Sequence, residues 1–219
     1  ADLEGADGVE IYAEGLLLEP LHIGFNMNVP EGALPEGDTI PEDFFKDVRI
    51  RQAFNHAFDY TAFVQGALAG FGEINPHYVP IGVFGYDPNA PVYGEQNLAE
   101  AERLFREAGV WDEGFTATVV VESGSLFEIQ CLILKDSIEA MNPDMRINVL
   151  GVAEAVFDEA IASETVNYAM WALSPGEHLI SSCVARVSAL LSRQLHSSLT
   201  WERLAVWTLE STVRAGVRT

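Results

Sequence analysis

The chain has 219 residues, and 48% of them are hydrophobic, which is enough to build the core of one large domain or two small ones. It carries 33 Asp and Glu against 12 Lys and Arg. A surface with the resulting net charge of −21 repels phosphate backbones and anionic lipid headgroups, so the composition argues against nucleic acid as a partner.

The charge is unevenly distributed along the chain. Residues 1–173 contain 30 acidic and 7 basic side chains, whereas residues 174–219 contain 3 and 5, so the net charge changes from −23 to +2. The second part also has eight serines and no Asp, Asn, Phe, Tyr or Met. A frameshift near codon 173 would explain these changes together, and we favour it over a native tail of amphipathic helices, which the spacing of Val184, Val187 and Leu190 permits.

The start of the chain lacks the features of a secretion signal. It has neither the basic start nor the apolar core of a signal peptide, and no stretch approaches the roughly 20 apolar residues that span a bilayer. We therefore expect either that a signal has been removed or that the chain begins within a longer protein.

Motifs for cofactors, metals and common catalytic centres are absent from the sequence. The five histidines lack the i, i+4 spacing of a helical zinc site, and the two cysteines, Cys131 and Cys183, are too far apart for a metal cluster. There is no Walker loop, Rossmann glycine motif or nucleophile elbow. We expect no cofactor and no metal.

The predicted elements begin with two extended segments, residues 9–18 and 21–29. A Pro- and Gly-rich surface loop over residues 30–43 follows them. Asp47 can then cap a helix with a regular apolar stripe, and Asp59 can cap a second helix.

A long loop rich in Pro, Gly and Asn extends from residue 70 to residue 94. Loops of this length are either functional or loosely held. The next helix is well defined in the sequence, because Asn97 and Glu100 resemble a capping box and Gly109 supplies the stop.

Strands and helices alternate in the following part of the chain. The pattern predicts strands over residues 115–122, 146–150 and 167–173, with helices over 126–141 and 154–162 between them. Helical crossovers between short apolar strands imply parallel pairing, so we expect an α/β architecture.

The first of these strands ends in a polar turn, Glu122, Ser123 and Gly124. The carboxyl ends of parallel strands face the ligand crevice in α/β sheets, so these residues are candidates for ligand contact. We favour the simpler interpretation, an ordinary β-to-α turn in which Ser125 caps the helix.

Four segments resemble the extracytoplasmic solute-binding proteins of family 5, which serve peptide- and nickel-type ABC importers. The segments are PLHIGFNMNV, FFKDVRIRQAFNHAFDYTAFVQGALAG, GYDPNAPVYGEQNLAEAERLFREAGV and MNPDMRINVLGV. Their order agrees with the family, and the resemblance covers about residues 9 to 173.

The resemblance implies a lobe of the type II periplasmic-binding-protein kind, with a mainly parallel sheet flanked by helices. Residues 1–29 would be crossing strands from the interlobe region, residues 30–173 the ligand-binding lobe and residues 174–219 an atypical tail. The first lobe of the family would be missing.

The implied function is capture of a small solute, an oligopeptide, between two lobes and its delivery to an ABC permease in the membrane. No bond is made or broken, so the protein would not be an enzyme. The resemblance also implies an extracytoplasmic location, in the periplasm or at the cell surface, with a lipid anchor in the full-length protein. We expect a monomer.

The expected ligand contacts are five residues. Phe25 and Asn26 end the strand that crosses between the lobes, Tyr78 lies in the long loop, and Trp171 and Ser174 lie at the end of the last strand.

The sequence departs from the family pattern after Trp171. Members of the family follow this strand with a Trp and then an Asp, and in peptide-binding members the carboxylate can pair with the amino terminus of the ligand. If Trp171 is the matching aromatic, Ser174 replaces that carboxylate. If the matching Trp belongs further on, the motif is absent.

Three alternatives stay open. The cargo could be another solute, such as a nickel complex or an oligosaccharide, because the carboxylate that would pair with a peptide's amino terminus is not seen. An acidic hydrolase of unrecognised type would need paired carboxylates in one pocket. A non-functional fragment, a lobe without its partner, would expose apolar surface.

Overall fold

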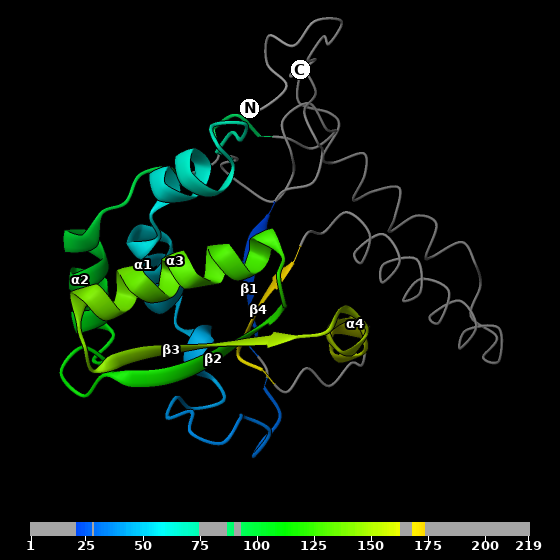
Figure 1. Ribbon diagram of the computed structural model, residues 1–219. Helices are drawn as coiled ribbons and strands as arrows, with labels where there is room; N and C mark the ends of the chain where they lie inside the picture. Colours follow the sequence, from blue (N-terminus) through cyan, green and yellow to red (C-terminus); the bar gives the residue numbers. More distant parts are fainter. Residues whose placement is uncertain (1–20, 28, 75–86, 90–92, 163–167, 174–219) are drawn as a thin grey trace, which may run out of the picture.

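The computed structural model describes residues 21–27, 29–74, 87–89, 93–162 and 168–173 (Figure 1). They form a four-stranded sheet in the order β1-β4-β2-β3. In chain order the elements are β1 (His22–Phe25), the 3-10 turn η1 (Phe44–Lys46), α1 (Val48–Ala57), the π-helical turn η2 (Ala62–Ala67), α2 (Leu98–Glu107), β2 (Phe115–Glu122), α3 (Leu126–Met141), β3 (Met145–Val152), α4 (Glu154–Ala162) and β4 (Met170–Leu173).

The sheet is mainly parallel, as the alternation of strands and helices predicts. β2 pairs in parallel with β3 along its whole length and with β4 at Val119 and Val120. β1 lies at one edge and is antiparallel to β4, with Phe25 opposite Met170. The predicted α/β fold is therefore confirmed, and the antiparallel strand comes from the segment that precedes the alternating part.

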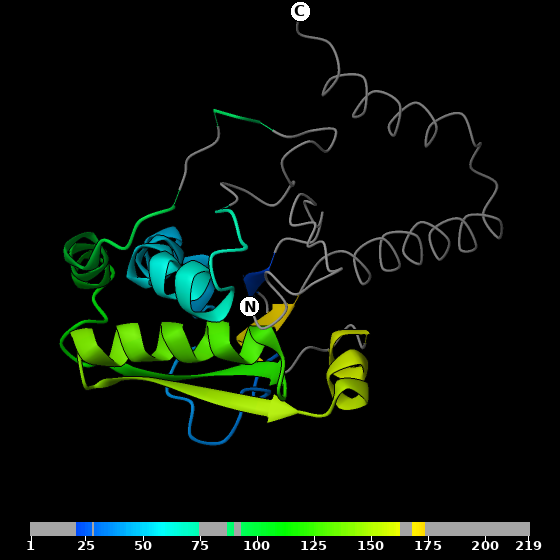
Figure 2. The same ribbon diagram turned by 45° about the horizontal axis from the view of Figure 1, so that its top comes forward.

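An aromatic core lies between the sheet and helices α1, α2 and α3, which all lie on the same side of it (Figure 2). Phe54 is central to this core: its ring centroid is 5.7 Å from that of Phe105 on α2 and 6.0 Å from that of Phe115 on β2. Burial of a side chain of this size contributes roughly 1.5–3 kcal/mol. The cluster therefore fixes the positions of α1 and α2 on the sheet.

The starts of the helices are capped as predicted. Asp47, Asn97 and Ser125 each accept a hydrogen bond from a backbone N–H in the first turn of the helix that follows, at 2.8, 3.1 and 3.3 Å. Glu100 does not complete a capping box, because the N–H of Asn97 donates to the carbonyl of His56 at 2.8 Å while the carboxylate of Glu100 pairs with Arg103.

Some elements differ from their predicted bounds. The helix expected after Asp59 is a π-helical turn, although Asp59 does accept a hydrogen bond from the N–H of Ala62 at 2.8 Å. β1 and β4 have four residues each and are shorter than the predicted 21–29 and 167–173. The strand predicted at 9–18 lies outside the described residues.

The predicted division into three segments stays a prediction. Of residues 1–29 the structure describes only 21–27 and 29, and residues 174–219 lie outside the described part. β1, from the first segment, belongs to the same sheet as the strands of residues 30–173. Within the described ranges no helix combines the length and apolarity needed to cross a membrane.

The part of β2 that β4 does not reach is paired by the loop before η1. Thr39 donates its N–H to the carbonyl of Thr116 at 3.0 Å, and its hydroxyl oxygen accepts the N–H of Thr116 at 2.8 Å. The carboxylate of Asp38 accepts the N–H and the hydroxyl of Thr118 at 3.0 and 2.6 Å. The loop is thus fastened to the sheet, and the buried Thr118 has its hydrogen bonds.

The outer edge of β3 is covered by two side chains of α3. The N–H of Ile147 donates to the carboxylate of Glu139 at 3.2 Å, and its carbonyl accepts from Lys135 at 3.0 Å. Lys135 and Glu139 also form an ion pair at 2.5 Å. Unpaired backbone groups at a sheet edge can pair with a strand of another chain. Here the N–H and the carbonyl of Ile147 already have partners on α3.

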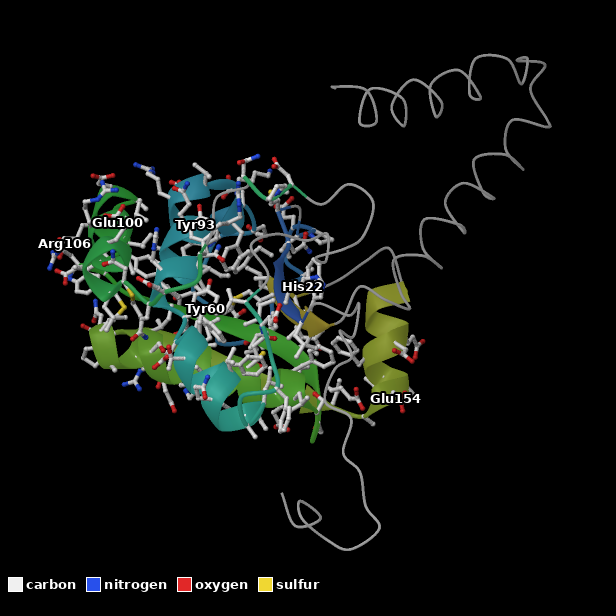
Figure 3. The ribbon with its side chains drawn as sticks, turned by 90° about the horizontal axis from the view of Figure 1, so that it is seen from above. His22, Tyr60, Tyr93, Glu100, Arg106 and Glu154 are labelled. Atoms are coloured by element: carbon white, nitrogen blue, oxygen red, sulfur yellow. The ribbon has the colours of Figure 1, made fainter. Side chains whose placement is uncertain are left out.

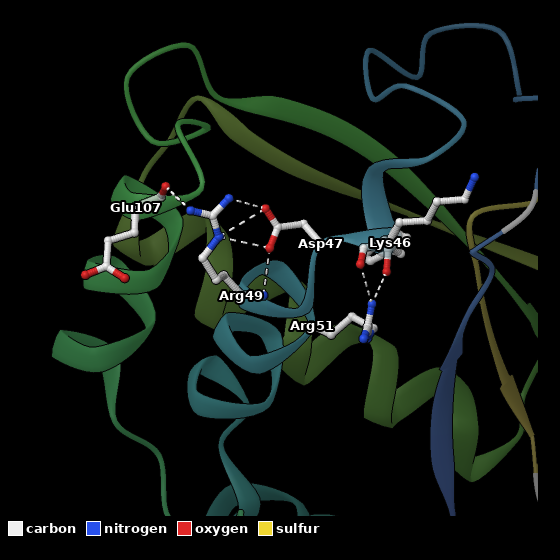
Figure 4. A network of polar contacts seen from close by, with 6 residues as sticks. Lys46, Asp47, Arg49, Arg51 and Glu107 are labelled. Carbon is white, nitrogen blue, oxygen red and sulfur yellow. Dashed lines mark hydrogen bonds and ion pairs between the residues drawn. The ribbon is translucent and has the colours of Figure 1, made fainter.

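Arg49 joins the start of α1 to the end of α2 (Figure 4). Its guanidinium donates to the carboxylate of Asp47 at 2.5 Å and to the carbonyl of Glu107 at 2.6 Å. The side-chain hydrogen bond from Arg49 lowers the pKa of Asp47, although burial opposes it. Arg51 donates in the same way to two backbone carbonyls of η1. These contacts are partly exposed, so they orient the two helices more than they stabilise the fold.

Candidate ligand-binding surface at the carboxyl edge of the sheet

The carboxyl ends of three strands meet at one edge of the sheet, which we call the carboxyl edge. β2, β3 and β4 run parallel and end there at Glu122, Val152 and Leu173. β1 runs the other way and begins there, because His22 lies opposite Leu173. Ligands of open α/β sheets bind at this edge, so it is the candidate site.

The turn that leaves β2 at this edge is held by its own hydrogen bonds. Ser123 donates its N–H to the carbonyl of Val152 at 2.9 Å, and Gly124 donates to the carboxylate of Glu128 at 2.6 Å. Gly124 has a φ of 78°, a conformation that favours glycine. Ser125 caps α3, so the interpretation as an ordinary β-to-α turn is confirmed.

Trp171 lies on the face of the sheet away from the aromatic core, two residue pairs inside the carboxyl edge. It is in register with Gly24 of β1 and Val120 of β2. Its half-buried indole packs with Val120, Tyr168 and Phe157 of α4 in a second, smaller apolar cluster. An indole at this position offers a large, stiff contact surface to a ligand.

Phe25 lies on the opposite face of the sheet. Its ring centroid is 4.7 Å from that of Phe45 and 5.5 Å from that of Phe54, so its described contacts are with the aromatic core. This placement follows from the alternation of side chains along a strand, since Phe25 and Gly24 point to different faces.

Asn26 follows β1 at the amino end of β4. Its N–H donates to the carbonyl of Ala169 at 2.8 Å, and its side-chain amide donates to the carbonyl of Tyr168 at 3.3 Å. These bonds anchor the end of β1 to the segment before β4. The structure thus brings Phe25, Asn26 and Trp171 onto neighbouring strands but not onto one surface.

Tyr78 and Ser174 lie outside the described residues. The role of all five residues as ligand contacts therefore stays a prediction. Among them Trp171 is the described residue that lies nearest the carboxyl edge, by its register with Gly24.

The described cations are concentrated away from this edge. Every Lys and Arg of the described ranges belongs to η1, α1, α2, α3 or β3, and the two on β3 and α3, Arg146 and Lys135, both lie close to Glu139. Figure 3 shows Arg106 and Glu100 on α2 at one end of the molecule and Glu154 on α4 at the other. The charges that the described chain offers near the carboxyl edge, from Glu122 and Glu154, are negative.

A surface hollow of about 380 Å³ lies at the opposite edge of the sheet, where β2 begins. It is lined by residues of η1, the start of α1 and the turn before β2, including Asp43, Lys46 and Phe115. Its position at the amino end of β2 separates it from the carboxyl edge, and we do not include it in the candidate site.

Two residues that surround Trp171, Phe157 and Gly24, are not among the predicted site residues. Phe157 carries a signal, because it is an aromatic residue in a short predicted helix, and the structure shows it buried against Val120. Gly24 carries none, because its contact with Trp171 depends on the pairing of two strands that are far apart in the chain.

A family model described as bacterial extracellular solute-binding proteins, family 5 middle, matches residues 2–178. No curated protein matches the chain. Among solved structures, the oligopeptide-binding protein AppA from Bacillus subtilis, in complex with a nonapeptide, is 19% identical with a TM-score of 0.58 over 73% of this chain and 31% of its own.

Two further structures are similar. NikA from Brucella suis, in complex with Fe(III)-EDTA, is 16% identical with a TM-score of 0.56 over 72% of this chain and 30% of its own. HbpA2 from Haemophilus parasuis is 25% identical with a TM-score of 0.55 over 72% of this chain and 28% of its own. The chain thus spans less than a third of the length of these structures.

Proposed function

Because the chain belongs to the family 5 bacterial extracellular solute-binding proteins, we propose that it forms part of the solute receptor of an ABC importer. The match over residues 2–178 carries the proposal. The receptor binds its solute outside the cytoplasm, as a monomer held by a lipid anchor in the full-length protein, and passes it unchanged to a membrane permease.

The cargo that we propose is an oligopeptide. AppA, which shares the fold, holds a nonapeptide. The half-buried indole of Trp171 near the carboxyl edge suits apolar peptide side chains, because aromatic rings give large contact area at small cost in entropy. NikA, which holds Fe(III)-EDTA, supports a metal chelate as the alternative cargo.

The described sheet and helices would supply one wall of the binding site. In a two-lobed receptor the ligand stabilises the closed form through contacts with both lobes. A single wall makes only part of these contacts, so we expect this chain alone to bind peptide weakly, with a Kd on the order of 1 mM.

The sign of the charge predicts which peptides bind best. Residues 1–173 carry a net charge of −23, and the described side chains near the carboxyl edge are acidic. Basic and neutral peptides should therefore bind more tightly than acidic ones, and the preference should weaken as salt is added.

Peptide binding can be measured by ¹⁹F NMR on the full chain labelled with 5-fluorotryptophan. The probes are synthetic penta- and nonapeptides with free termini, in basic, neutral and acidic versions, together with Fe(III)-EDTA and an oligosaccharide. We expect basic and neutral peptides to shift the resonance of Trp171, assigned by its loss in Trp171→Phe. Because replacing Trp171 removes this reporter, the affinities of variants are compared by titration calorimetry. Trp171→Ala should weaken binding about fivefold, whereas Trp111→Ala, the matched control at a tryptophan on the far side of the molecule beside Arg106, should not.

The results distinguish a peptide receptor from a receptor for another cargo, from a hydrolase and from a fragment that binds no ligand. Saturable shifts with peptides alone support the proposal. A response to Fe(III)-EDTA or to the oligosaccharide without one to peptides overturns the peptide cargo, and peptide cleavage detected by mass spectrometry overturns the receptor. No response to any probe at 10 mM, about tenfold above the expected Kd, overturns ligand capture by this part of the chain.

A further inference from the structure

Gly24 lies directly beneath the indole of Trp171. The two residues are opposite each other in the antiparallel pair of β1 and β4. A methyl group added at Gly24 would lie 2.7 Å from Cε2 of Trp171, 2.8 Å from Nε1 and 3.0 Å from Cζ2. Non-bonded carbon atoms prefer separations of about 3.5–4.0 Å, so no other residue fits here without movement.

The glycine is not explained by the backbone. The glycines of the described residues that have positive φ are Gly32, Gly37, Gly70, Gly109, Gly114 and Gly124, and Gly24 is not among them. Any residue could adopt its extended conformation, and glycine is disfavoured inside strands because it has more conformational freedom to lose. The space that the indole occupies is therefore the physical reason for glycine at this position.

The indole is held from the other strands as well. Val120 lies beside Trp171 in the parallel pair of β2 and β4, and Phe157 of α4 packs in the same cluster. The indole is a rigid ring with neighbours on several sides, so it cannot make room by rotating a flexible terminal group, as a long aliphatic side chain could. A side chain at Gly24 would have to tilt the whole ring or push the edge strand β1 away from β4.

We propose that Gly24 is a positioning residue that seats the indole of Trp171 against β1 and so sets the orientation in which the ring meets a ligand. The effect on ligand binding rests on the proposed function. The packing of the indole against Gly24, which we call the seat, does not. A ring lying along the sheet presents its face to an apolar side chain, whereas a ring displaced by about 1 Å or more would narrow the space above it.

The seat is tested without ligand by ¹⁹F NMR of the 5-fluorotryptophan-labelled chain. Gly24→Ala should move the Trp171 resonance and leave the other tryptophan resonances in place. Gly66→Ala is the matched control, because nothing lies within 4 Å of a methyl group added there, and it should move none of them. A folded Gly24→Ala protein whose Trp171 resonance is unmoved overturns the seat.

Peptide affinity separates positioning from general structural damage. With the neutral pentapeptide as probe in titration calorimetry, which needs no tryptophan reporter, Gly24→Ala should raise Kd about fivefold in the native background and leave it unchanged in the Trp171→Ala background. An equal loss in both backgrounds overturns the positioning role. If the native chain binds no peptide, the proposed function fails while the ligand-free resonance still decides the seat.

A folding failure of Gly24→Ala is also informative, because the smaller ring of Trp171→Phe should make room for the methyl group. If Gly24→Ala unfolds and the double variant Gly24→Ala, Trp171→Phe folds, the clash with the indole is the cause and the seat is supported. If the double variant also fails to fold, β1 itself needs the glycine and the proposal is overturned.

Discussion

Two groups, a buried thiol and a partly buried phenol, are held protonated by their surroundings. Burial raises the pKa of Cys131 on α3 to about 12, with a smaller contribution from the charge of Glu128. Burial likewise raises the pKa of Tyr60 to about 12, and its hydroxyl donates to the carbonyl of Asn55 at 3.2 Å. In the unfolded chain these groups lose their protons near pH 8.5 and 10.

Stability should therefore fall in alkali. Between the unfolded and the folded pKa values the native state binds more protons than the unfolded state, so rising pH favours unfolding. For Cys131 alone the loss should be about 2 kcal/mol between pH 7 and pH 10. Urea unfolding followed by circular dichroism at both pH values measures it.

The variant Cys131→Ala should lose less stability than the native chain over this range, by about the same 2 kcal/mol. Cys183→Ala, at the other cysteine, is the control for the thiol as such. An identical pH dependence in the native chain and in Cys131→Ala would show that the buried thiol does not contribute.

Side-chain direction is the residue-scale property that the sequence predicts least well. Phe25 and Trp171 are both expected near the ligand, Phe25 because its strand crosses between the lobes and Trp171 because it lies at the end of the last strand. Their faces depend on which side of the sheet α1 covers, and this is decided by tertiary packing of Phe25 against Phe45 and Phe54. Local spacing carries no information on that choice.

At the scale of elements, the outer edge of β3 depends on α3. Glu139 and Lys135 occupy the N–H and the carbonyl of Ile147. Burial raises the pKa of Glu139, but the hydrogen bonds from Lys135 and Ile147 outweigh it, and the pKa is lowered overall. A lowered pKa means that this contribution to stability is lost as the pH falls through the folded value.

Removal of the carboxylate should destabilise the fold and expose the edge. Glu139→Ala leaves the amide of Ile147 without its acceptor and should cost about 1–2 kcal/mol in urea unfolding, with more aggregation by light scattering. The matched control is Glu102→Ala, which also removes a Glu that forms an ion pair one helical turn away, here with Arg106, but on the exposed face of α2. It should cost less than about 0.5 kcal/mol. Equal costs would contradict an edge-specific role for Glu139.

Elements with local signals were predicted well, and those without were not. The bounds of β2, α3 and α4 agree with the prediction, because the apolar spacing of each segment is local and the Ser125 cap directly precedes α3. β1 and β4 are shorter than predicted, since their lengths depend on mutual pairing. The carboxyl edge followed from the βαβαβ order, but the packing around Trp171 did not.

At the scale of the whole molecule, negative charge is in large excess. Most cations of the described residues are already paired with carboxylates, as Arg103 is with Glu100 and Glu107. The remaining acidic side chains repel one another in the compact state. Because the Debye length shrinks from about 10 Å at 0.1 M to 3 Å at 1 M salt, this repulsion is screened by added salt.

Salt should therefore stabilise the protein. The melting temperature should rise by several degrees between 0.1 and 1 M NaCl in differential scanning calorimetry. A variant with exposed Glu36, Glu95 and Glu113 replaced by Gln should melt higher at low salt and respond less to NaCl. A salt response of the same size in this variant would mean that sodium chloride acts through something other than the excess charge.

The pairing of β1 with β4 joins residues that are about 150 positions apart in the chain. A ribosome that adds roughly 5–20 residues per second makes β4 about 8–30 s after β1. Until β4 has been made, β1 has no strand to pair with, and Gly24 does not yet have the indole of Trp171 packed against it. The sheet cannot close early, so a chain exported as we propose would stay open to the translocation machinery until β4 has been synthesised.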